Sequence, residues 1–288
     1  MLTSKMRKVL FCVVGIMVML TLTVCGDDKG ITTSGDGDGD DTPSDTTTSS
    51  GEYELVWSEE FNYEGSPDPD IWNFEIGDNG WGNNELQYYT DRLDNARVGD
   101  SVLTITAREE NYEGANYTSA RMITYENDHY WQYGRVEARI KMPEGQGIWP
   151  AFWMLGKNIF EGTTWPATGE IDILEMVGGG ENNRILHGTA HWEEGGHQYQ
   201  GGSVTHSEKL SQDFHTYAIE WDDQQIRWFF DGEQYYSLSI QSSAMSEFDA
   251  PFFILLNIAV GGDWPGSPDS TTEFPQTMKV VYVRVYQK

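Results

Sequence analysis

Cysteine is almost absent from this chain of 288 residues, which contains only two. These are Cys12 and Cys25, and both lie close to the N-terminus. The rest of the chain therefore has neither a disulfide framework nor a thiol nucleophile. We expect its stability to come from a packed hydrophobic core, which a chain of this length can supply.

Basic residues are scarce as well. The chain has 18 Lys and Arg against 46 Asp and Glu, a formal net charge of -28. Such an excess of negative charge argues against nucleic acid as a partner and against docking to anionic lipid. Aromatic residues, by contrast, make up 13% of the chain and include 11 Trp. Indole rings stack well on the apolar faces of sugars, so a neutral glycan partner is compatible with this composition.

The apolar run at residues 9–24 follows Lys5, Arg7 and Lys8, which is the pattern of a secretion signal. The run is short for a membrane span. Cys25 follows it directly and resembles the cysteine of a bacterial lipobox. We expect cleavage before Cys25 and acylation of its thiol, which would tether a lipoprotein to the bacterial cell envelope or surface. The alternative is an ordinary signal peptide and a secreted protein.

Composition divides the chain into three parts. Residues 1–24 are the expected signal peptide, residues 25–51 are an acidic linker of Gly, Ser and Thr, and residues 52–288 are the expected folded domain. The linker has almost no apolar residue and cannot form a core, so we expect a flexible spacer.

The domain has the sequence pattern of β-strands throughout. Residues 134–142 alternate apolar and charged side chains, as a strand with one solvated face does. Residues 252–260 are nearly all apolar, which is typical of a strand buried on both faces. Many strands without a βαβ rhythm predict an all-β fold, a β-sandwich of jelly-roll type. Further strands are expected at 54–61, 101–108, 214–221, 225–230, 233–240 and 278–286, and one short helix at 242–248.

Three acids interrupt an apolar run at Gly169–Met176. Glu170 and Asp172 are two residues apart, so on a strand they point to the same face. Glu175 lies at an odd offset and would point to the other face. A β-bulge that adds one residue between Asp172 and Glu175 would return it to the first face. Ile171, Ile173 and either Leu174 or Met176 would then point into the core.

The spacing of these acids predicts a chemistry. With such a bulge, the carboxyl groups of Glu170 and Glu175 would lie about 5–5.5 Å apart, the separation of a retaining glycosidase. Asp172 would lie between them and could bond to the nucleophile. Two acids on one strand face usually form only a solvated surface. The third acid and the nearby Trp residues favour the catalytic interpretation, because buried carboxylates cost free energy and need a role.

Four Trp residues are candidates for the walls of a groove. Trp149 and Trp153 are four apart and share a strand face, while Trp165 and Trp264 lie in Pro- and Gly-containing loops. We expect Trp149 and Trp264 to stack on sugar rings, and Trp153 to lie either in the groove or in the core. The polar cluster at residues 83–87 offers amides for hydroxyl groups or caps a turn.

A metal site at His187 and His191 is excluded by distance. On a strand, residues four apart are about 13 Å apart, too far to ligate one ion. His191, which follows the acid strand, could instead reach the acids.

Six motifs carry a resemblance to a known family: Asn83–Thr90, Tyr117–Arg121, Tyr133–Arg139, Gly147–Trp153, Gly169–Glu175 and Leu256–Gly262. Together these segments resemble glycoside hydrolase family 16, in particular its bacterial laminarinase branch of endo-β-1,3-glucanases. The resemblance implies a curved jelly roll with the glycan lying across a concave sheet. It also implies that the E-x-D-x-x-E form is the bulged, laminarinase-like version of the acid motif, since the lichenase branch has a shorter one.

The resemblance implies a role for each acid. Glu170 would be the nucleophile, Glu175 the general acid and then the base, and Asp172 would hold the environment of the nucleophile. The groove residues that it implies are Asn84, Arg121, Trp149, Trp153, His191 and, by a looser match, Trp264.

No cofactor is expected to be required, and the expected partner is a β-glucan polysaccharide bound by a monomer. Family members often bind a structural calcium through an Asp of the last strand, but Val281 stands at that position and cannot ligate through its side chain. A calcium there is left open. Two alternatives also stay open: the same fold acting on mixed-linkage β-1,3-1,4-glucan or agar, and a non-catalytic β-glucan-binding protein. The intact acids count against the second.

Overall fold

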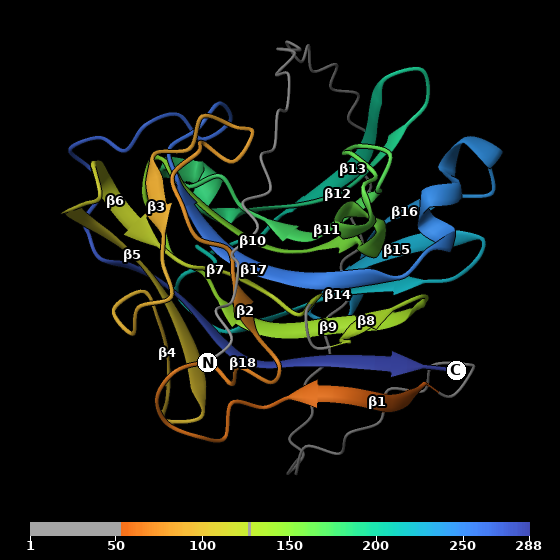
Figure 1. The fold of residues 1–288 in the computed structure, drawn as a ribbon, viewed down its shortest axis with the longest axis horizontal. Helices are drawn as coiled ribbons and strands as arrows, with labels where there is room; N and C mark the ends of the chain where they lie inside the picture. The colour runs from red at the N-terminus through yellow and green to blue at the C-terminus, as the bar shows by residue number, and fades with distance from the viewer. Residues whose placement is uncertain (1–52, 126–127) are drawn as a thin grey trace, which may run out of the picture.

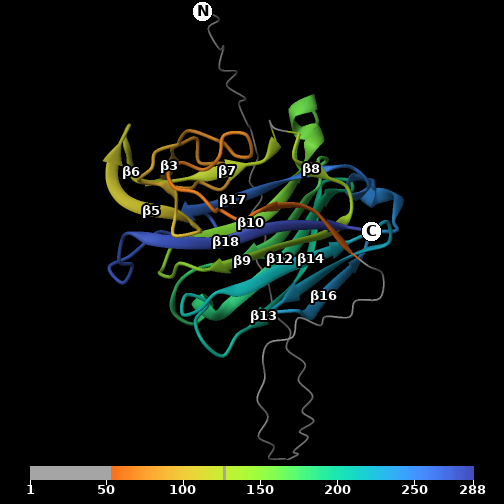
Figure 2. The ribbon, with the colours of Figure 1, turned by 90° about the horizontal axis from the view of Figure 1, so that it is seen from below.

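The computed structural model describes residues 53–125 and 128–288, which form two β-sheets packed face to face (Figures 1 and 2). The expected signal peptide and the whole of the expected linker, including Cys25, lie outside the described residues. Within the described part of the chain, no helix is long and apolar enough to cross a membrane. The expected all-β sandwich is confirmed.

The larger sheet has ten strands. They are β1 (Glu54–Glu59), β3 (Gln87–Tyr89), β4 (Ala96–Gly99), β5 (Val102–Tyr112), β6 (Ala115–Ser119), β9 (Gly134–Lys141), β14 (His215–Trp221), β15 (Gln225–Phe230), β16 (Glu233–Ser239) and β18 (Gln276–Gln287). Their order is β16-β15-β14-β9-β18-β5-β6-β3, with β1 paired to β18 and β4 to β5. Strands β1 and β18, far apart in the sequence, lie side by side near the bottom of Figure 1.

The second sheet has eight strands. They are β2 (Asn73–Phe74), β7 (Arg121–Ile123), β8 (Tyr130–Trp131), β10 (Ile148–Gly156), β11 (Glu170–Glu175), β12 (Ile185–Glu193), β13 (His197–Thr205) and β17 (Phe252–Val260). Their order is β13-β12-β11-β10-β17-β7-β2, and β8 pairs with β17. The acid motif therefore lies inside this sheet, on a strand with a neighbour on each side.

Each strand expected from the sequence pattern is present within a few residues. The expected helix is the 3₁₀ segment η4 (Ser243–Asp249), which begins after Ser242, whose hydroxyl accepts a hydrogen bond from the Ala244 N–H. Two further 3₁₀ segments, η2 (Lys157–Glu161) and η3 (Gly180–Arg184), were not expected. They are too short to show a hydrophobic period in the sequence.

The core lies between the two sheets and fixes which face of the eight-stranded sheet is free. On β10, Ile148, Phe152 and Met154 are fully buried in this core. All nine residues of β17 are buried, as expected for a strand covered on both faces. Both Leu174 and Met176 lie in the core, where the sequence predicted only one of them. The reason is that alternation restarts after the bulge, so both neighbours of Glu175 point inward.

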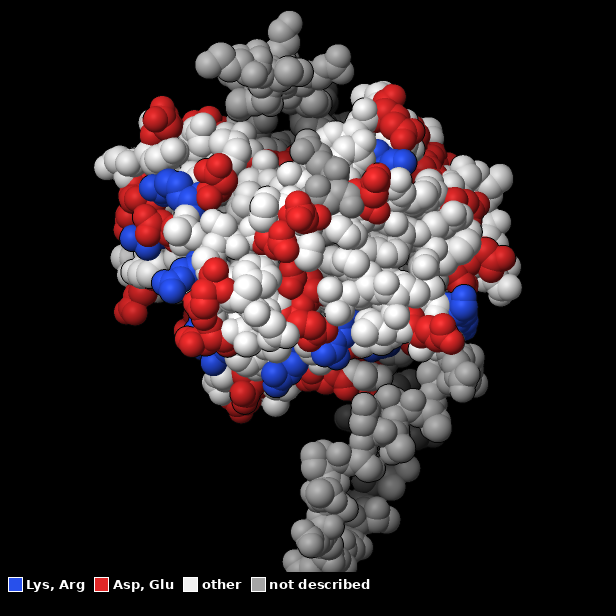
Figure 3. Space-filling model, turned by 60° about the horizontal axis from the view of Figure 1, so that its bottom comes forward, with Lys and Arg blue, Asp and Glu red and all other residues white. Residues whose placement is uncertain are grey.

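Charge is spread over the surface. Figure 3 shows Asp and Glu side chains distributed over one face, with Lys and Arg side chains lying among them. Many of the basic side chains of the described chain are paired, as in the contacts of Arg135 with Glu137 and Glu220 and of Arg284 with Glu60. The face shown in Figure 3 therefore has no broad basic patch for a polyanion.

Candidate active site

The outer face of the eight-stranded sheet forms a groove with a volume of about 710 Å³. Side chains that alternate with the core residues line it, for example Trp149, Ala151 and Trp153 on β10. Every catalytic or substrate-binding residue expected from the sequence lines this groove except Asn84. The expected residues that line it are Arg121, Trp149, Trp153, Trp165, Glu170, Asp172, Glu175, His191 and Trp264.

Asn84 points elsewhere. It is exposed, and its side-chain amide donates hydrogen bonds of 3.0 and 3.1 Å to the two carboxylate oxygens of Asp263. Its backbone has φ 54°, a left-handed turn conformation, and its neighbours Asn83 and Glu85 line the groove instead. The sequence cannot show which of two adjacent asparagines in a tight turn faces the groove.

The bulge expected in β11 is present. Against β10, Asp172 pairs with Trp153 and Leu174 pairs with Phe152, so Ile173 is the extra residue. Against β12, Asp172 pairs with Thr189 while Glu175 pairs with His187, and the register shifts between them. Glu170, Asp172 and Glu175 consequently all reach the groove.

The three carboxyl groups share few neutralising partners. Asp172 and Glu175 are 3% and 9% exposed. Desolvation by burial raises the pKa of Glu170, Asp172 and Glu175 to about 8, and repulsion from Asp172 adds to the effect on both glutamates. Groups coupled in this way lose their protons in succession. Near neutral pH, the cluster therefore still holds protons, as a general acid requires.

His191 and Arg121 distinguish the two glutamates. The Nε2 atom of His191 lies 3.0 Å from Asp172 Oδ2 and 3.8 Å from Glu170 Oε1. His191 and Arg121 both lower the pKa of Glu170, against the larger effect of burial. Glu175 has His191 and, as its own hydrogen-bond donor, the Trp149 indole N–H at 3.0 Å. His191 and Arg121 thus favour the ionised form of Glu170, whereas His191 and a neutral indole donor favour that of Glu175.

Aromatic side chains flank the acids on both sides along the groove. Beside Glu175, the Trp264 ring lies 5.5 Å from that of Trp149 and 5.1 Å from that of His187. Beside Glu170, the Trp165 ring lies 4.4 Å from that of His197. The groove continues past the acids in both directions, as binding within a long chain requires.

Comparison with known proteins identifies the family. The model of the glycosyl hydrolases family 16 matches residues 80–284. The chain belongs to this family.

Several relatives of this family 16 chain are similar along most of its length. A β-glucanase of Rhodothermus marinus is 46% identical over 257 residues, which are 85% of this chain and 88% of the relative. A glucan endo-1,3-β-glucosidase of Cryptopygus antarcticus is 40% identical, over 81% of this chain and 92% of the relative. The solved laminarinase catalytic domain of Thermotoga maritima superposes with a TM-score of 0.74 at 46% identity, covering 82% of this chain and 99% of that domain.

The family 16 groove also contains Trp81, Glu75 and Asn257, which the sequence did not point out. The expected Arg121 lies between the rings of Trp81 and Trp153, at 4.9 and 4.8 Å from their centroids, and donates a hydrogen bond of 2.5 Å to Glu75. Asn257 accepts a hydrogen bond of 2.7 Å from the Trp153 indole. Asn257 had a usable signal, because it is a polar residue inside an otherwise apolar strand. Trp81 and Glu75 had none, because they lie in loops or beside short strands.

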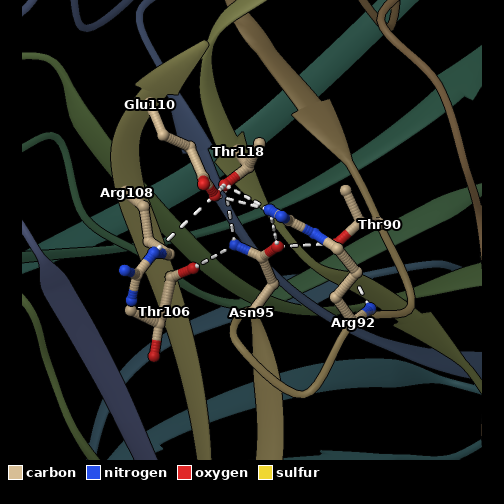
Figure 4. Close-up of polar contacts among 7 residues, drawn as sticks. All are labelled: Thr90, Arg92, Asn95, Thr106, Arg108, Glu110 and Thr118. Atoms are coloured by element: carbon tan, nitrogen blue, oxygen red, sulfur yellow. Dashed lines mark hydrogen bonds and ion pairs between the residues drawn. The ribbon is translucent and has the colours of Figure 1, made fainter. Parts of the chain in front are cut away.

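A polar network ties one side of the groove to the larger sheet (Figure 4). Arg92 Nη2 donates to Glu110 Oε1 at 2.5 Å and to Thr118 Oγ1 at 3.2 Å. Asn95 donates to the Thr106 carbonyl and to Thr118 Oγ1, both at 3.0 Å. The network joins the segment after β3 to β5 and β6, and β3 follows the loop that carries the groove residues Trp81 and Glu85.

Val281 cannot supply a side-chain carboxylate to a calcium site near the last strand. Val281 falls at a register shift of β18 against β9, and its side chain has no oxygen. Among the described residues, the one group of three potential metal-ligating side chains is Glu170, Asp172 and His191, on the other sheet. We assign this group to acid–base chemistry, because His191 Nε2 lies 3.0 Å from Asp172 Oδ2, within ion-pair distance.

Proposed function

We propose that this family 16 chain is a retaining endo-β-1,3-glucanase. The observation that carries the proposal is the bulge in β11, which brings Glu170, Asp172 and Glu175 to one face of an aromatic-walled groove. The names of its relatives, among them a β-glucanase and a glucan endo-1,3-β-glucosidase, support the same activity.

The reaction takes two steps. The Glu170 carboxylate attacks the anomeric carbon while the Glu175 carboxylic acid gives its proton to the departing glycosidic oxygen, which leaves a covalent glycosyl-enzyme. Glu175, now a carboxylate, then takes a proton from water as that water attacks the same carbon and releases Glu170. Two inversions retain the anomeric configuration. Asp172, with His191 Nε2 at 3.0 Å from its Oδ2 atom, would keep the environment of Glu170 in the charge state that the attack needs.

The charge of the groove favours a neutral glycan. Its lining includes the carboxylates Glu75 and Glu85 in addition to the three acids of β11. Arg121 is the one Lys or Arg among the lining residues, and it is paired with Glu75. A sulfated glycan would need unpaired cations there. Indole rings provide stacking surfaces for uncharged sugar rings instead.

The test is hydrolysis of laminarin by the wild-type chain and by Glu170→Ser. We expect the wild type to release reducing ends whose anomeric proton, followed by NMR early in the reaction, is first β. We expect Glu170→Ser to lose at least about 10³-fold in kcat while still binding the glycan. Equal turnover by the two proteins would overturn the catalytic assignment.

Two alternatives are settled by a substrate panel of laminarin, lichenan and agarose. A chain that leaves laminarin intact but cuts another glycan has the proposed chemistry on a different substrate. A chain that binds laminarin without cutting any glycan is a binding protein.

We further propose that Cys25 is lipidated and that the mature protein is a monomer tethered to the cell envelope. The support is the apolar run followed by Cys25 in the sequence. The test is metabolic labelling with a radioactive fatty acid in a bacterial host, with Cys25→Ser as the control. Label in both proteins or in neither would contradict lipidation, and size-exclusion chromatography of the domain would test the monomer.

A further inference from the structure

The catalytic strand is held from behind by the other sheet. Trp228, on β15, is completely buried, and its indole N–H donates a hydrogen bond of 2.8 Å to the main-chain carbonyl of Asp172. Asp172 is the last residue before the register shift in β11. The contact therefore joins the ten-stranded sheet to the backbone at the edge of the bulge.

A glycine on β12 makes room for this contact. A Cβ atom on Gly188 would lie 2.4 Å from Trp228 Cδ1, 2.4 Å from the Tyr235 hydroxyl oxygen and 2.8 Å from Trp228 Nε1. Gly188 lies between Thr189 and His187, the partners of Asp172 and Glu175 across the register shift. Any side chain at this position would push the indole away from the bulge.

The Tyr235 hydroxyl lies beside the Trp228 indole at the same glycine. It is buried and has no hydrogen-bond partner among the described residues. Burial, together with the nearby Asp172 and Glu175 carboxylates, raises the pKa of Tyr235. Among these side chains behind the acids, Trp228 is the donor that reaches the catalytic strand.

The backbone at a bulge needs such a donor. A bulge leaves its extra residue unpaired and disrupts the ladder around it, so the register on its two sides is less firmly fixed than in a regular strand. Here Glu170 and Asp172 precede the bulge and Glu175 follows it. The conformation of this bulged segment sets the distance between nucleophile and acid, and a shift of about 1 Å can cost about 10²-fold in rate.

We propose that Trp228 is a positioning residue that fixes the bulge, and through it the placement of Glu175 relative to Glu170. The proposal rests on the proposed glycosidase function. Trp228 touches no reacting atom. Its indole N–H acts through the Asp172 carbonyl, and Gly188 is the residue that admits it.

The test compares Trp228→Phe with Trp221→Phe. Phenylalanine keeps an aromatic ring and removes the N–H group. Trp221 is the matched control, because it is 1% exposed on the neighbouring strand β14 and its indole nitrogen has no hydrogen-bond partner among the described residues. We expect Trp228→Phe to lower kcat on laminarin by about 10²-fold at an unchanged KM. We expect Trp221→Phe to change kcat by no more than about threefold, since it loses packing but no bond to the site.

A second readout separates positioning from general loosening. The 2,4-dinitrophenyl β-glycoside of laminaribiose releases its phenolate without a proton from Glu175, so its burst reports attack by Glu170 alone. In Trp228→Phe, we expect the burst rate to stay near the wild-type value while turnover of laminarin falls. Gly188→Ala, which keeps the indole but displaces it, should give the same result if Trp228→Phe does not fold.

Three results would overturn the proposal. The first is a kcat of Trp228→Phe on laminarin equal to that of Trp221→Phe, and the second is an equal loss of burst rate and laminarin turnover in Trp228→Phe. The third is normal turnover of laminarin by Gly188→Ala. Failure of the proposed function would look different, because wild-type protein would then leave laminarin intact.

Discussion

Two clusters of polar side chains lie on the strands of this protein, and they are neutralised very differently. In the network of Figure 4, Glu110 accepts hydrogen bonds of 2.5 Å from Arg92 and from Thr118, and these bonds hold its pKa below the usual value. In the groove, three carboxyls share His191, and burial raises the pKa of each to about 8.

This difference suits the first cluster to stabilising the fold and the second to acid–base chemistry. A network in which each charge meets an opposite charge and a donor stabilises the fold and holds its protons fixed. A cluster with too few partners costs free energy, but its protons move near neutral pH, which is what a general acid needs. We therefore expect substitutions in the first cluster to change the free energy of unfolding, and substitutions in the second to change turnover.

The largest expected effect is on turnover. Glu170→Gln keeps the shape of the side chain and removes the nucleophile, so kcat on laminarin should fall by at least about 10³-fold. The melting temperature should not fall, because the change removes a buried carboxyl whose ionised form is poorly neutralised. Glu110→Gln is the matched control and should keep kcat within about twofold, since it lies outside the groove. A melting temperature for Glu170→Gln well below that of the wild type would break the comparison.

The next effect is on the pH dependence of stability, where the two clusters have opposite signs. The groove carboxyls have folded pKa values near 8, above the 4.5 of a free glutamate. Their contribution to the free energy of unfolding is complete below pH 4.5 and is lost as pH rises through about 8. Glu110 has a folded pKa below 4.5, so its contribution is present above pH 4.5 and is lost as pH falls.

Urea unfolding at several pH values measures both signs. Between pH 5 and pH 8, the free energy of unfolding of the wild type should fall by about 3 kcal/mol more than that of Glu170→Gln. As pH falls below 4.5, the free energy of unfolding of Glu110→Gln should fall by less than that of the wild type. Parallel curves for the wild type and Glu170→Gln would show that Glu170 has an ordinary pKa in the folded state.

A smaller effect is expected in the Figure 4 network. Arg92→Met removes the cation but keeps an apolar stem, and it leaves Glu110 without its main partner. The free energy of unfolding should fall by about 2 kcal/mol, less than for a fully buried pair, because both side chains remain partly solvated. Turnover of laminarin should stay within about twofold of the wild type. A large loss of kcat without a loss of stability would show that the network serves the groove directly.

The sequence predicted the groove cluster better than the contacts behind it. The odd offset of Glu175 from Glu170 predicted a bulge, and the register of β11 against β12 has one. Such a prediction works because strand alternation is a local rule. The spacing of Trp149 and Trp153 worked for the same reason.

Contacts between sheets left no such signal. Trp228 meets the main-chain carbonyl of Asp172, and a main-chain acceptor looks the same at every position of a sequence. Gly188 has a role only once the two sheets are packed together. The orientation of Asn84 could not be predicted for a related reason. Backbone conformation, and not residue type, decides which of the two asparagines lines the groove.

The smallest expected effect concerns Trp149, which joins the acid of the groove to its aromatic wall. Its indole N–H donates to Glu175 and lowers the pKa of that carboxyl, because the bond favours the ionised form. Trp149→Phe keeps a stacking ring and removes this donor, so the pKa of Glu175 should rise. The alkaline limb of the pH profile of kcat/KM, which reports loss of the proton from the acid, should then move upward. A single hydrogen bond is worth about 1 kcal/mol, which corresponds to a shift of about 0.7 pH unit.

Trp264→Phe is the matched control, since its ring lines the same end of the groove without a hydrogen bond to any of the three acids among the described residues. It should weaken glycan binding and leave the alkaline limb in place, whereas a shift of equal size in both variants would mean that stacking, and not the indole N–H, sets the proton affinity of Glu175.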